Sequence, residues 1–127
     1  MKTRVIIWVA ATLLALASQA WAGEPAATPT QAPVPGMVTL VDLGAGTCKP
    51  CKLMAPLLEE LKAQYQGRAA VVFVDVRNDR PAIERFGIRA IPTQIFFDRQ
   101  GREVRRHLGF LDKETMAQAL DELLAAR

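Results

Sequence analysis

The chain has 127 residues, 50% of them hydrophobic and 23% charged, which allows one domain with a packed core and excludes wholesale disorder. The formal net charge of +3 is small, and the basic residues are scattered among acidic ones instead of gathering with aromatic side chains. Nucleic acid is therefore not an expected partner.

Residues 1–22 have the pattern of a secretory signal peptide. Two basic residues open the chain, residues 5–17 are apolar except for Thr12, and Ala20 and Ala22 form an A-x-A cleavage site. The apolar run is shorter than the about 20 residues that span a bilayer. We therefore expect export with cleavage, which is periplasmic in a Gram-negative host. The alternative is an uncleaved anchor that holds the protein on the membrane, facing the periplasm.

Residues 23–36 follow as a proline-rich linker, and residues 37–127 are expected to form the domain. The elements expected in chain order are a strand over 37–43, a helix over 48–67, a strand over 69–76, a short helix over 80–86, strands over 93–98 and 103–108, and a helix opening at Asp112 with Thr115 in its first turn. Pro56 should kink the first helix. The near-continuous apolar run over 69–76 predicts a strand buried on both faces.

This order predicts an α/β fold with a mixed sheet of about four strands flanked by helices. Two strands separated by a helix imply a parallel crossover, whereas the two later strands, joined by a short turn, imply an antiparallel hairpin.

The segment GTCKPCK contains the only cysteines of the chain, Cys48 and Cys51. A zinc site needs about four ligands, and the chain offers two thiols and the lone His107, which we expect to be exposed on the outer hairpin. A purely structural disulfide over two intervening residues would close a very short loop and stabilise the fold little. Redox chemistry is the third interpretation.

The redox interpretation fits the position of the cysteine pair between a strand and a helix. Unpaired N–H groups and the helix dipole favour a thiolate at Cys48, so we expect Cys48 to be the nucleophile and Cys51 to resolve the mixed disulfide. Lys49 and Lys52 add positive charge, although both also suit an ordinary solvated helix face. Pro50 suits the first helical turn.

Three segments in order resemble the thioredoxin family over residues 37–126: VDLGAGTCKPCKLMAP, GIRAIPT and GREVRRHLGF. The resemblance implies a thioredoxin-like fold and a cis-proline at Pro92 that faces the disulfide. It also implies a groove for a substrate peptide. The groove residues would be Ala90, Ile91, Pro92, Thr93 and Gly109.

The sequence departs from the family pattern beside the cysteines. Thr47 stands where the family usually has tryptophan, and Lys49 where it has glycine, which suggests a dedicated partner. Asp42 occupies the position of the family's buried acid, which would help to deprotonate Cys51, but Phe73 stands where a lysine often accompanies it. We therefore expect Asp42 to ionise with difficulty, because burial disfavours the charged form. The alternative for Asp42 is an acid at a solvated strand end.

The family's usual first strand and helix are also missing. The strand over 71–76 would then lie at the sheet edge. We expect part of residues 24–36, or another protein, to cover it.

The sequence therefore predicts an exported thiol-disulfide oxidoreductase that needs no cofactor besides the Cys48–Cys51 pair. The resemblance favours a reductant of protein disulfides, which would need a membrane thiol transporter as electron donor. One alternative is an oxidase that donates its disulfide, which Lys49 would favour by stabilising the reduced thiolate. Another is a thioredoxin-like module that binds a metal or a partner.

Overall fold

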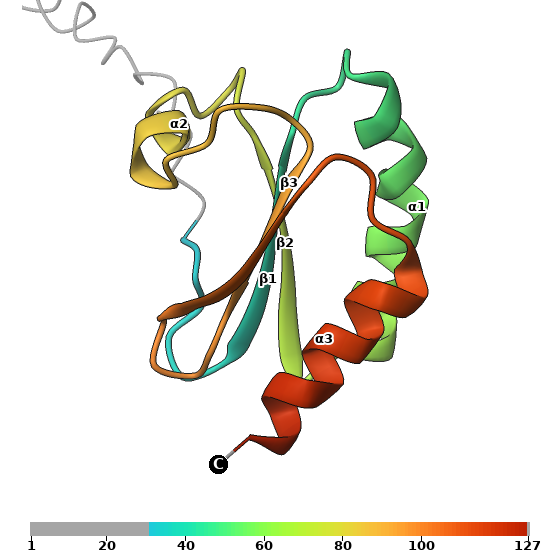
Figure 1. The fold of residues 1–127 in the computed structure, drawn as a ribbon, viewed down its shortest axis with the longest axis vertical. Coiled ribbons are helices and arrows are strands. Elements are labelled where there is room, and N and C mark those ends of the chain that lie inside the picture. The colour runs from blue at the N-terminus through green and yellow to red at the C-terminus, as the bar shows by residue number, and fades with distance from the viewer. Residues whose placement is uncertain (1–30, 127) are drawn as a thin grey trace, which may run out of the picture.

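The structure is a computed structural model, and it describes residues 31–126 (Figure 1). The predicted signal peptide and residues 23–30 of the predicted linker lie outside the described residues. The elements are β1 (Val38–Gly44), α1 (Lys49–Gln64), β2 (Ala69–Asp75), α2 (Pro81–Arg85), β3 (Thr93–Phe97), β4 (Glu103–Leu108) and α3 (Lys113–Ala125). The predicted order of strands and helices is confirmed. Asp112 caps α3 as expected, because its Oδ1 accepts the N–H of Thr115 at 2.8 Å.

The four strands form one sheet in the order β2-β1-β3-β4. β1 and β2 run parallel, as a crossover through α1 requires, and the other two pairs are antiparallel. The predicted mixed sheet is confirmed. β1 lies inside the sheet, and all seven of its residues are buried.

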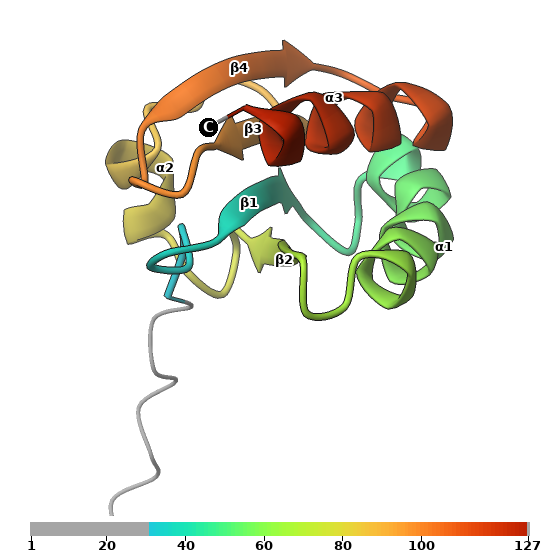
Figure 2. The same ribbon diagram turned by 90° about the horizontal axis from the view of Figure 1, so that it is seen from below.

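The helices cover both faces of the sheet (Figures 1 and 2). α1 and α3 pack on one face, around Leu40, Met54, Leu61 and Phe96. The short α2 covers the other face, where Phe86 packs beside Ile95. Because side chains alternate along a strand, neighbouring residues of β1 reach these two separate cores.

β2 lies at one edge of the sheet, as predicted, but it is not buried on both faces. Val71 and Val74 are buried, whereas 46% of Phe73 is exposed. The prediction that this strand is buried on both faces was wrong. No described strand pairs with the outer side of β2 to enclose Phe73.

The described part of the linker does not cover this edge. Ala32 packs against the α2 side of the sheet, and the N–H of Val34 donates to Thr39 Oγ1 of β1 at 3.1 Å. Pro33 lies beside Gly101 in the turn between β3 and β4, away from β2. Within residues 31–126, no helix is both long and apolar enough to cross a membrane.

Candidate active site

The two cysteines stand at the start of α1 and form a disulfide. Cys48 is the N-cap residue, and its Sγ accepts the N–H of Cys51 at 3.3 Å. Pro50 occupies the first turn, where a missing N–H costs no helical hydrogen bond. α1 continues as one helix through Pro56 to Gln64.

The two sulfurs differ in their access to solvent. Cys48 is half-buried, whereas only 4% of Cys51 is exposed. The free N–H groups of the first helical turn favour negative charge on Cys48. A substrate can therefore reach Cys48, while Cys51 is placed to attack from inside. Lys49 and Lys52 are both exposed.

At Gly44 the backbone of β1 passes close to the sulfur of Cys51. A Cβ on Gly44 would lie 2.9 Å from Cε2 of Phe73 and 3.1 Å from Sγ of Cys51. The missing side chain of glycine therefore lets β1 pass close beneath Cys51.

We predict that Gly44→Ala lowers the free energy of unfolding by about 1–3 kcal/mol, because the added methyl overpacks the site. Gly46→Ala is the matched control, since no atom lies within 4 Å of the added Cβ. Urea unfolding of both variants measures the difference. Equal stabilities would contradict the close packing at Gly44.

Asp42 lies completely buried in β1, with Phe73 opposite it on β2 and Gln94 opposite it on β3. Burial raises the pKa of Asp42 from 3.8 to about 6, and the hydrogen bond from Gln94 opposes this rise. Nε2 of Gln94 donates to Asp42 Oδ1 at 2.8 Å. Asp42 is thus not an acid at a solvated strand end.

The expected groove residues border the start of β3 and the end of β4, which lie at the end of the sheet where β1 leads into the cysteine loop (Figure 1). Thr93 pairs with Leu43, and its Oγ1 donates to the carbonyl of Ala90 at 2.7 Å. The Ile91–Pro92 peptide bond is cis. The carbonyl of the buried Pro92 accepts the N–H of Gly109 at 2.8 Å, while Ala90 is exposed and Ile91 and Gly109 are half-buried.

Two residues of the site, Gln94 and Arg77, were not expected from the sequence. Gln94 is fully buried, and its polarity within the apolar run TQIFF was a signal that could have been used. Arg77 Nη1 donates to Thr47 Oγ1 at 3.0 Å, which joins the loop after β2 to the cysteine loop. No sequence pattern brings Arg77 and Thr47 together.

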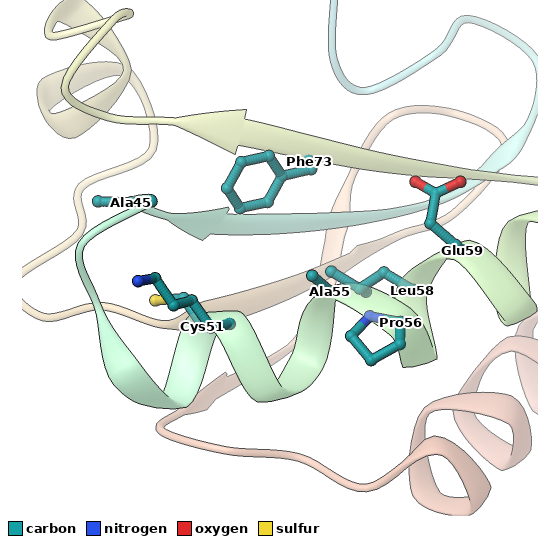
Figure 3. A pocket seen from close by; sticks show the side chains of 9 residues that line it. Ala45, Cys51, Ala55, Pro56, Leu58, Glu59 and Phe73 are labelled. Carbon is teal, nitrogen blue, oxygen red and sulfur yellow. The ribbon is translucent and has the colours of Figure 1, made fainter.

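An apolar hollow of about 380 Å³ lies beside Cys51, between α1 and β2 (Figure 3). Phe73 forms its β2 side, and Ala55, Pro56 and Leu58 form its helix side. The exposed ring of Phe73 therefore lies close to Cys51.

Metal-binding side chains do not cluster in the described part of the chain, where no group of three or more His, Cys, Asp or Glu residues is suitably placed. His107 is half-buried, not exposed as expected, and its Nε2 lies 3.1 Å from the carbonyl oxygen of Phe110.

Comparison with known proteins gives concordant matches in sequence and structure. A family model described as Thioredoxin matches residues 33–122. A thioredoxin of Staphylococcus aureus is 41% identical over 87 residues, which cover 68% of this chain and 83% of the relative.

Solved structures give the same result. A thioredoxin variant of Halobacterium salinarum is 27% identical with a TM-score of 0.65, and the match covers 72% of this chain and 79% of that one. The germline-specific thioredoxin Deadhead of Drosophila melanogaster is 28% identical with a TM-score of 0.62, over 69% of this chain and 82% of that one.

Proposed function

The chain belongs to the thioredoxin family, and from this premise we propose that it is an exported reductant of protein disulfides. It is a thiol-disulfide oxidoreductase whose Cys48–Cys51 pair is the active site. We further propose that a membrane thiol transporter returns it to the reduced state. The observation that carries the proposal is the accessible Cys48 at a helix N-terminus, joined to a buried Cys51.

The first step is attack by the Cys48 thiolate on a substrate disulfide. The bond between the substrate sulfurs breaks, a mixed disulfide forms on Cys48, and one substrate sulfur leaves as a thiolate. The backbone around Ile91 and Pro92, beside the cysteine loop, is where an extended substrate segment would lie.

The second step releases the substrate. Cys51 gives its proton to the Asp42 carboxylate, and the resulting thiolate attacks the sulfur of Cys48. The mixed disulfide breaks, the substrate leaves with both sulfurs reduced, and Cys48 and Cys51 become a disulfide. Two electrons have passed from the protein to the substrate, and a donor dithiol reverses the sequence.

The proposal that the chain is an exported reductant can be tested in one experiment on the full chain expressed in a Gram-negative host. Cells are quenched with acid, their thiols are alkylated, and the periplasmic fraction is analysed by mass spectrometry. We expect a chain that begins at Gly23 and carries two alkylated cysteines. A periplasmic chain found mainly as the disulfide would indicate an oxidase, and a chain that keeps residues 1–22 would contradict cleavage.

A further inference from the structure

A row of four paired side chains crosses the sheet on the face that α1 and α3 cover. The strand registers place Phe73 opposite Asp42, Asp42 opposite Gln94, and Gln94 opposite His107. Directly paired residues of neighbouring strands point to the same face of a sheet. The two inner members, Asp42 and Gln94, are completely buried.

Gln94 uses its amide group to connect this row to α1. Its Nε2 donates to Oδ1 of Asp42 at 2.8 Å and lies 3.3 Å from Sδ of Met54. Met54 is one helical turn after Cys51, and Gly44, two residues after Asp42 on the same face of β1, lies directly beneath Cys51. The Asp42 carboxyl group therefore lies under the turn that carries the resolving sulfur.

Two buried side-chain oxygens in this region, Oδ2 of Asp42 and Oε1 of Gln94, have no hydrogen-bond partner within residues 31–126. Both are acceptors when the carboxyl group is ionised. Buried acceptors without a donor are costly, and one proton on the carboxyl group would turn Oδ2 into a donor. The disulfide state thus favours a proton on Asp42, which is where the resolving step leaves one.

We propose that Gln94 is a positioning residue for the resolving step, because it holds Oδ1 of Asp42 and leaves Oδ2 free to take the proton of Cys51. This inference rests on the proposed function. Among the described residues, the Gln94 side chain bonds to Asp42 and Met54 and to neither cysteine, so it acts through Asp42. With Phe73 in place of a cation on β2, the Gln94 amide is the polar partner of the acid.

The surroundings of Asp42 leave Gln94 as its main polar influence. Burial raises the pKa of this acid, and the Gln94 hydrogen bond lowers it. Other titratable groups stand on the elements packed around it. They are Lys49, Cys51, Lys52, Glu59, Glu60 and Lys62 of α1, Asp75 of β2, Glu103, Arg105, Arg106 and His107 of β4, and Lys113, Glu114, Asp121 and Glu122 of α3.

The test replaces Gln94 with methionine, which has a similar shape and no N–H. Reduced protein is mixed with 5,5′-dithiobis(2-nitrobenzoate) in a stopped-flow instrument between pH 5 and 8. The first released thiolate reports attack by Cys48, and the second reports resolution by Cys51. In Gln94→Met we expect the first phase to be unchanged. The pH midpoint of the second phase should move up by about one pH unit, with the rate at pH 6 falling about fivefold.

The controls separate this inference from the proposed function. If wild type shows no first phase, the proposed nucleophile is wrong. If wild type shows both phases and Gln94→Met keeps the same pH midpoint, or slows both phases equally, Gln94 is only structural. In an Asp42→Asn background, Gln94→Met should cause no further slowing. Titration of the Asp42 carboxyl carbon by NMR gives a second readout, and Gln94→Leu replaces the methionine variant if that variant fails to fold.

Discussion

A Cys51→Ser variant is expected to stop turnover halfway and to hold its substrate as a covalent mixed disulfide on Cys48. Cys48 is the accessible sulfur at the start of α1 and can still attack. The buried serine hydroxyl cannot then displace the substrate, because it is a far weaker nucleophile than a thiolate. Turnover should fall on the order of a thousandfold or more. Non-reducing electrophoresis with mass spectrometry detects the trapped species.

Cys48→Ser is the matched control, and it should lose turnover without trapping a substrate. Cys51 is nearly enclosed by α1, β1 and Phe73, so a protein substrate cannot reach its sulfur. Trapping by Cys48→Ser but not by Cys51→Ser would exchange the roles of the two cysteines.

Asp42→Asn should stabilise the disulfide form at neutral pH while it slows the resolving step. The rise in the pKa of Asp42 from 3.8 to about 6 corresponds to about 3 kcal/mol, at about 1.4 kcal/mol per pH unit. An asparagine carries no charge, and its amide nitrogen can supply a donor where Oδ2 lacks a partner.

The sign of the pH dependence follows from the direction of this pKa change. The folded state holds the proton of Asp42 more tightly than the unfolded state, so protonation of Asp42 stabilises the fold. This stabilisation is complete below about pH 3.8. It is lost as the pH rises through about 6. The stability difference between Asp42→Asn and wild type should therefore grow from about pH 4 to pH 6 and then level off.

Urea unfolding of the disulfide forms, followed by far-ultraviolet circular dichroism from pH 3 to pH 8, measures this difference. We expect the free energy of unfolding of Asp42→Asn, minus that of wild type, to be larger at pH 7 than at pH 3 by about 3 kcal/mol. The resolving phase should slow at least about tenfold, because no carboxylate then takes the proton of Cys51. A stability difference that does not change with pH would contradict the raised pKa of Asp42 in the folded protein.

Much of the fold follows from patterns that the sequence carries locally. Strand and helix periods, the Asp112 cap and the strand-loop-helix placement of the cysteines depend on neighbouring residues, and the structure agrees with them. The mixed sheet follows from the lengths of the connections. The position of Phe73 opposite Asp42 came from the family resemblance, and the strand register agrees.

The remaining features depend on contacts between distant segments. An apolar run predicts burial, but it cannot show that Phe73 lies on an edge strand beside a hollow. A glutamine between apolar residues does not show which acid it meets, and the Gln94–Asp42 bond joins residues 52 positions apart. The need for glycine at Gly44 likewise arises only when Cys51 and Phe73 close over it.

The direction of electron flow depends on the reduction potential of the Cys48–Cys51 pair. Residues 23–127 contain no tryptophan, so tryptophan fluorescence cannot report the redox state. The redox state is better followed by equilibration in glutathione buffers, acid quenching and alkylation. A reductant should have a reduction potential of about −270 mV, the value of thioredoxin. A potential close to about −120 mV, the value of a strong disulfide donor, would contradict a reductant and reverse the direction of exchange.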